Sequence, residues 1–156
     1  MRDPDQFNNE GYLDLTAYFA IRNTVGRRTP ANEDWVYRRG DIYLANLNPF
    51  VGSEQGGTRP VVVLQNNTGN FYCPTVIVAP ITSRSDKRLD LPVHYFVKST
   101  RGLNGSAVVL LEQIKTIDKC RIRKYLGKMS QAQIDEISEK LKISLGLYVP
   151  KKMKVP

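Results

Sequence analysis

From Gly40 onward, short apolar and β-branched runs alternate with Gly, Pro and Asn. Turn residues at such short intervals divide a chain into short strands, as in a small antiparallel barrel or sandwich. The expected strands lie at 41–46, 60–65, 75–82, 91–97, 107–111 and 115–118, the last with a continuation near Ile122. The runs at 61–64 and 76–81 are continuously apolar, so we expect them to be buried on both faces.

A helix is predicted near the C-terminus. Ser130 and Gln133 have the spacing of a capping box, and Ile134, Ile137 and Leu141 follow at helical spacing. One face of this helix should pack on the sheet. The sequence therefore predicts a mostly β fold with a C-terminal α-helix.

The chain divides into three parts. Residues 1–36 depart from the strand pattern, and their apolar positions fit a helix and a strand equally well. Residues 37–148 form the predicted folded domain, within which Gly146 is the expected stop of the helix. Residues 149–156 are expected to be a basic tail. The N-terminal extension keeps both structural alternatives open.

Charge is distributed unevenly between these parts. The net charge is +8, but residues 1–36 hold four basic and six acidic residues, whereas residues 37–156 hold nineteen basic and nine acidic residues. A basic folded part suggests a polyanionic partner, either nucleic acid or an acidic protein. A well-solvated basic surface would explain the charge equally well, so charge alone does not decide.

The remaining composition indicates a cytoplasmic protein. No apolar stretch approaches the ~20 residues that a membrane span needs. The polar, acidic N-terminus also lacks the features of a secretory signal. Cys73 and Cys120 are too few and too far apart in sequence for a disulfide framework or a CxxC metal site, so we expect two buried free thiols.

The residues also carry a family resemblance. The stretch 38–67, RRGDIYLANLNPFVGSEQGGTRPVVVLQNN, contains a strand beginning GD, a GSEQGG loop and an RP pair that opens the next strand. This combination resembles the MazF/PemK family of toxin endoribonucleases. The blocks PTVIVAPIT at 74–82, LLEQIKTIDKCRI at 110–122 and ISLGL at 143–147 agree with it. The likeness covers essentially all of the residues from 38 to 147.

The resemblance implies a fold, an activity and partners. The fold would be an SH3-like β-barrel with a C-terminal α-helix. The protein would be a type II toxin that cuts single-stranded mRNA without a cofactor and leaves 2′,3′-cyclic phosphate and 5′-hydroxyl ends. It would work as a homodimer, be neutralised by an acidic MazE-like antitoxin and favour a short U-rich, A-containing site such as UACAU.

Two residues carry the expected chemistry. The catalytic Arg and Thr of the family fall on Arg59 and Thr82. Arg59 stands before Pro60 at the base of the Gly-rich loop, where a guanidinium can fork onto phosphate oxygens. Thr82 ends a buried strand, so its hydroxyl should emerge at the rim of the core. The RNA 2′-hydroxyl can act as nucleophile, so cleavage requires donors more than it requires a metal.

Other candidates surround this pair. Some relatives carry a histidine where this chain has Thr58, so Glu54 could serve as the general base or could contact the RNA. His94, in an alternating strand, is expected to be structural. Phe50 could stack on an unpaired base, with core packing as the alternative. The RNA-binding candidates are Ser53, Gln55, Thr58, Arg84, Lys87, Glu112 and Gln113. Further basic residues that could hold phosphates are Arg88, Lys115, Lys119, Arg121, Arg123, Lys124 and Lys128.

Three functions compete. The leading hypothesis is the endoribonuclease toxin. A toxin of the same fold that poisons DNA gyrase without being an enzyme is the second, and a nucleic-acid-binding module without turnover is the third. Arg59 and Thr82 together, in this loop context, favour the ribonuclease. The sequence contains no HExxH motif and only one histidine, which argues against metal-assisted and two-histidine mechanisms.

Overall fold

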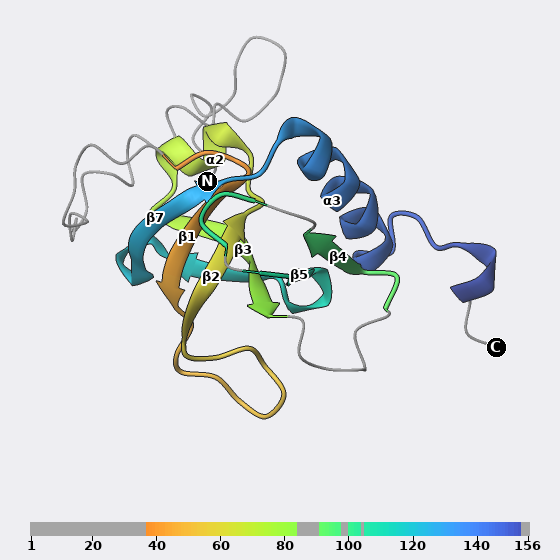
Figure 1. Ribbon diagram of the computed structural model, residues 1–156, viewed down its shortest axis with the longest axis horizontal. Helices are drawn as coiled ribbons and strands as arrows, with labels where there is room; N and C mark the ends of the chain where they lie inside the picture. Colours follow the sequence, from red (N-terminus) through yellow and green to blue (C-terminus); the bar gives the residue numbers. More distant parts are fainter. Residues whose placement is uncertain (1–36, 84–90, 98–99, 104, 154–156) are drawn as a thin grey trace, which may run out of the picture.

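The computed structural model describes residues 37–83, 91–97, 100–103 and 105–153 (Figure 1). This part of the chain forms a mostly antiparallel β-sheet and a long C-terminal helix. The strands are β1 (Asp41–Asn46), β2 (Thr58–Val63), β3 (Thr75–Ser83), β4 (His94–Val97), β5 (Ala107–Leu110), β6 (Lys115–Asp118) and β7 (Ile122–Lys128). The helices are α2 (Asn67–Tyr72) and α3 (Gln131–Ser144), with 3-10 turns η2 (Leu111–Gln113), η3 (Lys119–Arg121) and η4 (Lys151–Met153).

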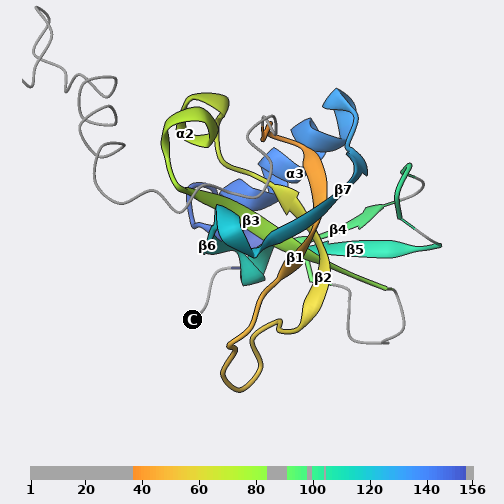
Figure 2. The same cartoon turned by 90° about the vertical axis from the view of Figure 1, so that its left-hand side faces the viewer.

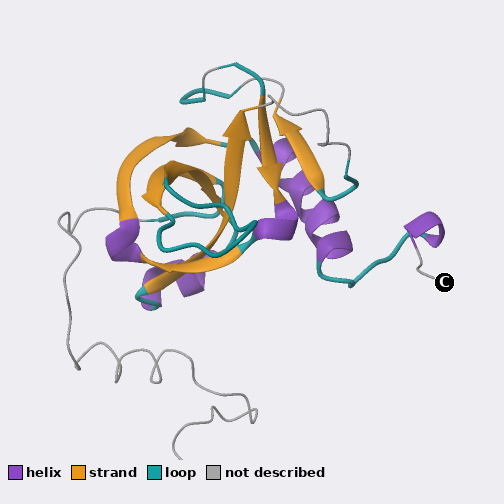
Figure 3. Ribbon diagram, turned by 90° about the horizontal axis from the view of Figure 1, so that it is seen from below, coloured by secondary structure: helices purple, strands orange, loops and turns teal. Residues whose placement is uncertain are grey.

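Strand β3 lies at the centre of the sheet. The strand order is β4-β5-β3-β2-β1-β7, and β6 pairs with β3 outside this path. Residues 75–78 of β3 pair with β6, residues 78–80 pair with β2, and residues 81–83 pair with β5. The sheet is strongly curved, so that several of its strands form an open ring in the view from below (Figure 3). Among the strands described, no ladder joins β4 to β7, so hydrogen bonds do not close the sheet.

The two faces of the sheet bury separate apolar clusters. Alternation along β1 and β2 places Ile42 and Val62 in the first cluster and Tyr43 and Val61 in the second. Helix α3 covers the first cluster and contributes the fully buried Ile137. The second cluster collects side chains from β1, β2, β3, β6 and β7. The run at 61–64 is therefore buried on both faces, as predicted.

Helix α3 begins as the sequence predicts. The Ser130 hydroxyl accepts a hydrogen bond from the Gln133 backbone N–H at 3.2 Å, and the Gln133 side chain accepts one from the Ser130 backbone N–H at 2.8 Å. The capping box is therefore complete. Ile134 and Ile137 are buried against the sheet. The helix ends two residues before Gly146, whose φ of 71° confirms it as the stop.

The predicted strand at 60–65 is displaced by two residues. It begins at Thr58, which pairs with Asn46 of β1, and it ends at Val63. The end is set by a local break in the ladder, because Leu64 and Gln65 both donate to one carbonyl of β3. Two successive donors on one acceptor cannot continue a regular antiparallel ladder.

Two other predicted elements also end differently. The strand predicted at 91–97 starts only at His94, because the His94 N–H closes a turn on the Leu91 carbonyl at 2.9 Å. A strand does begin at Ile122, as predicted, but it is separate from β6. The Asp118 carboxylate accepts a hydrogen bond from the Cys120 N–H at 2.8 Å and caps η3, so the chain turns. Strand β7 then pairs with β1, not with β3.

Three local features differ from the prediction: a short helix, the exposure of one isoleucine and the exposure of the two cysteines. Helix α2 follows Asn66, whose side chain accepts from the Gly69 N–H at 2.8 Å, although such polar residues usually indicate a loop. Ile77 is 37% exposed in a run that was expected to be buried. The two cysteines are free, as predicted, but Cys73 is half-buried and Cys120 is exposed. Asp118 raises the pKa of the Cys120 thiol, mainly through a hydrogen bond.

A pair of glycines joins the two ends of the sheet. A Cβ on Gly102 would lie 2.0 Å from the carbonyl oxygen of Leu126, and a Cβ on Gly127 would lie 2.1 Å from that of Arg101. The turn between β4 and β5 therefore packs its backbone directly on β7. No helix in the described ranges is long and apolar enough to cross a membrane.

The first prediction concerns the start of α3. Ser130→Ala removes the acceptor for the Gln133 N–H, and the free energy of unfolding should fall by about 1 kcal/mol. Urea denaturation with an unchanged m-value would measure the loss. Ser106→Ala changes an exposed serine that lies outside the helices and strands and should leave the stability within about 0.5 kcal/mol. Equal stability of the two variants would contradict the capping role.

Candidate functional site

The loop between β1 and β2 projects from one end of the sheet (Figures 1 and 2). Its base is closed by the Leu47 N–H, which donates to the Gly57 carbonyl at 2.9 Å, and by the Gly57 N–H, which donates to the Asn48 side chain at 2.7 Å. Gly57 has a φ of 74° and Gly52 a φ of 56°. Other L-residues rarely adopt this left-handed region, so the glycines fix the path of the loop.

Gly56 makes room for an aromatic ring within the loop. A Cβ at this position would lie 2.0 Å from Cδ1 of Phe50, so the ring rests on the glycine backbone. Phe50 nevertheless keeps 51% of its surface exposed. The ring is therefore packed against Gly56 on one side and exposed on the other. It is not part of the core.

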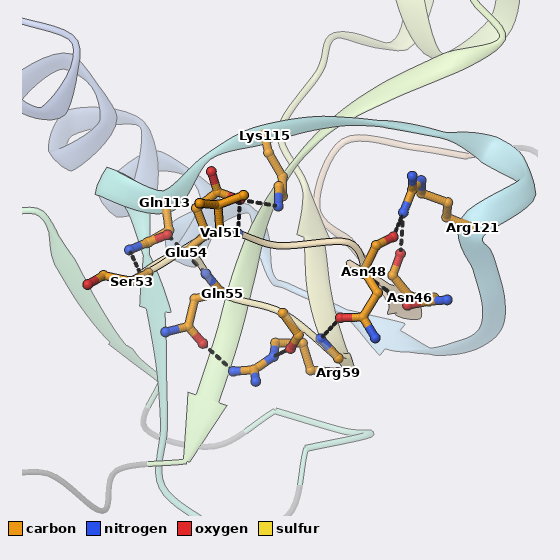
Figure 4. A network of polar contacts seen from close by, with 12 residues as sticks. Asn46, Asn48, Val51, Ser53, Glu54, Gln55, Arg59, Gln113, Lys115 and Arg121 are labelled. Atoms are coloured by element: carbon orange, nitrogen blue, oxygen red, sulfur yellow. Dashed lines mark hydrogen bonds and ion pairs between the residues drawn. The ribbon is translucent and has the colours of Figure 1, made fainter.

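Arg59 lies on β2 at the base of this loop. It pairs with Ala45 of β1, and its side chain is half-buried. The Nε atom donates to the Gly56 carbonyl at 2.7 Å, and the guanidinium also donates to the Gln55 side-chain oxygen (Figure 4). The two contacts orient the guanidinium beneath the loop.

Thr82 is the last residue but one of β3 and lies at the same end of the sheet (Figure 1). The last pair of the β2–β3 ladder is Val61 with Pro80, and Arg59 and Thr82 each lie two residues beyond that pair in their strands. Thr82 also pairs with Val108 of β5 and is half-buried. This partial burial near the end of a strand is consistent with the predicted place at the rim of the core.

The segment 113–115 holds the loop from the other side. The Gln113 amide oxygen accepts from the Gln55 N–H, and its NH₂ group donates to the Ser53 carbonyl, both at 3.2 Å (Figure 4). Glu54 accepts from the Val51 N–H at 3.2 Å and lies 3.8 Å from the Lys115 ammonium. The loop is therefore tethered to the strand and turn that follow β5.

A further brace for the loop was missed by sequence reasoning. Arg121, at the end of η3, donates to the carbonyls of Asn46 and Asn48, with a distance of 3.5 Å to Asn46. The Asn46 side chain in turn accepts from the Asn48 N–H at 3.0 Å. The Asn-Pro pair at 48–49 signals a turn, but no local pattern links it to an arginine so far along the chain.

The predicted RNA-binding residues have different surroundings. Ser53 and Thr58 are exposed, whereas Gln55 and Gln113 are half-buried. Glu112 lies 3.0 Å from Nε2 of His94, which is only 2% exposed. This burial supports the structural role predicted for the histidine. Arg84, Lys87 and Arg88 lie outside the described residues.

The basic residues are not equivalent either. Arg123, Lys124 and Lys128 are exposed on β7. Lys119 is half-buried, donates to the Asn70 carbonyl at 2.6 Å and lies over the Tyr37 ring at 5.2 Å. Burial lowers the pKa of Lys119. Lys119 is therefore poorly placed to hold a phosphate, in contrast to the prediction.

This arrangement defines a class: a small, mostly β protein that presents an arginine and a Gly-rich loop at one end of its sheet. The sequence profile of the PemK-like, MazF-like toxins of type II toxin-antitoxin systems matches residues 38–145. The chain belongs to this family.

Related proteins agree with this assignment. A curated endoribonuclease MazF of Staphylococcus saprophyticus is 52% identical over 112 residues, which cover 71% of this chain and 92% of the relative. The crystal structure of MazF from Deinococcus radiodurans superposes with a TM-score of 0.63 at 29% identity, over 72% of this chain and 99% of that one. A MazE-MazF structure from the same organism has a TM-score of 0.58 at 28% identity, over 74% and 100%.

The second prediction concerns the packing of the loop. Gly56→Ala should push the Phe50 ring away and loosen residues 50–57, because the new methyl group would overlap the ring. The amides of Glu54 and Gly57, which donate hydrogen bonds within the loop, should then exchange faster with deuterium. Gly105→Ala is the control, since it strains a positive φ of 72° but meets no atom within 4 Å. Unchanged exchange in Gly56→Ala would show that the ring contact does not order the loop.

Proposed function

We propose that this protein is the toxin of a type II toxin-antitoxin pair and a sequence-specific endoribonuclease for single-stranded RNA. The observation that carries the proposal is the placement of Arg59 beneath the GSEQGG loop, with its guanidinium bonded to Gly56 and Gln55, and of Thr82 near the end of β3. A fixed cation and a hydroxyl at one end of a sheet are suited to a phosphodiester. Membership in the MazF-like family supports the same activity.

The proposed reaction uses the RNA as its own nucleophile. The 2′-hydroxyl attacks the adjacent phosphorus, the bond to the 5′-oxygen breaks, and the products carry a 2′,3′-cyclic phosphate and a 5′-hydroxyl. Arg59 stabilises the negative charge of the transition state, and Thr82 donates a hydrogen bond to it. Of the roughly five N–H donors of a guanidinium, two point to Gly56 and Gln55, so the others can reach phosphate oxygens.

Glu54 fits either of its two expected roles. Its side chain is 53% exposed and lies within the loop, so it can reach a bound RNA. The Lys115 ammonium lies 3.8 Å from its carboxylate. Ser53, Gln55, Thr58 and Glu112 complete the proposed RNA-binding surface, together with Arg84 and Lys87 from outside the described residues, whereas the Gln113 amide is already hydrogen-bonded to Gln55 and Ser53.

The finer structural assignments are also proposals. The strong curvature of the sheet supports an SH3-like barrel (Figure 3). The excess of basic residues after residue 36 supports an acidic, MazE-like antitoxin as partner, and structures described as MazE-MazF complexes are consistent with it. We propose a cytoplasmic homodimer, with residues 1–36 as an extension, 37–148 as the ribonuclease domain and 149–156 as a tail.

The third prediction tests the activity itself. Purified protein should cleave a long single-stranded RNA in excess EDTA, because the proposed catalytic groups are side-chain donors. Sequencing the fragments and testing their ends for a cyclic phosphate would identify the reaction. Binding without cleavage would indicate a nucleic-acid-binding module, and inhibition of gyrase without RNA cleavage would indicate the other toxin mechanism. Activity lost in EDTA and restored by a divalent ion would overturn the metal-free mechanism.

The fourth prediction assigns the catalytic pair. Arg59→Ala and Thr82→Ala should each reduce kcat by about 10²- to 10³-fold, the usual loss when one preorganised donor is removed. RNA binding should be affected less than turnover, and melting temperature should show that both variants remain folded. Thr116→Ala, an exposed threonine on β6, is a matched control. A variant that cleaves at close to the wild-type rate would exclude that residue from catalysis.

A further inference from the structure

Gln113 contacts the loop with both ends of its side-chain amide. The oxygen accepts from the Gln55 N–H and the nitrogen donates to the Ser53 carbonyl, each at 3.2 Å. These partners are 58 and 60 residues earlier in the chain. Gln113 itself is half-buried at the end of η2, which begins with the fully buried Leu111. A side chain anchored beside the core therefore fixes two positions of an otherwise projecting loop.

The same contacts determine where the side chain of Gln55 lies. Gln113 holds the backbone of Gln55, and the Gln55 side-chain oxygen accepts a hydrogen bond from the guanidinium of Arg59. Figure 4 shows how contacts connect the three residues in space, from Gln113 through Gln55 to Arg59. Arg59 also bonds to the Gly56 carbonyl, which directly follows the segment 53–55 that Gln113 tethers.

We propose that Gln113 is a positioning residue for RNA cleavage, which acts on Arg59 through Gln55. This inference rests on the proposed function and deepens it. Gln113 keeps residues 53–55 in one place, so Gln55 holds the guanidinium in a fixed orientation before RNA binds. Preorganisation of this kind lowers the barrier because the cation does not have to be reoriented in the transition state.

The neighbouring ion pair cannot replace this contact. Lys115 lies 3.8 Å from Glu54, but the Glu54 side chain is 53% exposed. Exposed ion pairs are screened by solvent and restrict side chains only weakly. The amide of Gln113 instead makes two directional bonds to backbone atoms. We therefore expect the loop to depend on Gln113 more than on Lys115.

Positioning differs measurably from reading RNA bases. A residue that contacts a base changes which sequences are cut when it is replaced. A residue that acts through Gln55 and Arg59 changes the rate at every site and leaves the preferred sequence unchanged. Its effect should also become smaller when the Gln55 side chain is already removed, because both substitutions interrupt one chain of contacts.

The test compares Gln113→Ala with Gln113→Glu. The alanine variant loses both bonds, whereas the glutamate variant keeps an acceptor for the Gln55 N–H and loses the donor to the Ser53 carbonyl. Gln113→Ala should lower kcat by about 10-fold or more with KM changed less than about twofold, because small misplacements of catalytic groups are costly. Gln113→Glu should fall between it and the wild type. Gln131→Ala, an exposed glutamine on α3, is the control.

Deuterium exchange provides a readout that does not require RNA. The Gln55 amide should exchange faster in Gln113→Ala than in the wild type, and it should remain protected in Gln113→Glu. Adding Gln113→Ala to Gln55→Ala should lower kcat by less than about twofold further. Unchanged kcat, a higher kcat, a new preferred cut sequence or unchanged exchange of the Gln55 amide would each overturn the inference. If the wild-type protein does not cleave RNA, the proposed function fails, whereas the exchange measurements still test the clamp.

Discussion

The backbone pairing of β3 with three other strands is the constraint on which the rest of the structure depends. A single nine-residue strand pairs with β6, β2 and β5 in succession along its length. Because buried N–H and C=O groups must be paired, the positions of these three strands are set by one segment. The curvature of the sheet, the separation of its two apolar clusters and the position of Thr82 all follow from this sharing.

The loop above Arg59 is stabilised in a different way. Between Asn48 and Gly57 the backbone leaves the β1–β2 ladder, so its polar groups are paired mainly with side chains. Asn48, Gln113 and Arg121 supply these partners from three different parts of the fold. Such a loop can be specific in shape without a core of its own, and its geometry depends on few contacts.

The sequence contained enough information for the central strands and the terminal helix. Periodicity located β1, β3 and α3, because a buried run or a capping box is a local signal. Local signals failed where a hydrogen-bond partner is distant in sequence, or where a single hydrogen bond decides whether a strand continues. The end of β2 depends on a shared carbonyl of Ile77, and the break after β6 depends on one cap by Asp118. Arg59 and Thr82 came from the family resemblance, whereas the contacts of Gln113 and Arg121 required three-dimensional structure.

The contact between Gly102 and Gly127 has a consequence for sequence variation. Each glycine faces a backbone carbonyl of the segment that contains the other, and no side chain mediates the joint. A methyl group at either position would wedge the turn before β5 away from β7 and separate the two ends of the sheet. A larger residue at either position therefore cannot be accommodated by a change at the other, because the other position has no side chain that could be shortened. The two sites, 25 residues apart in sequence, therefore both require glycine for the same backbone contact.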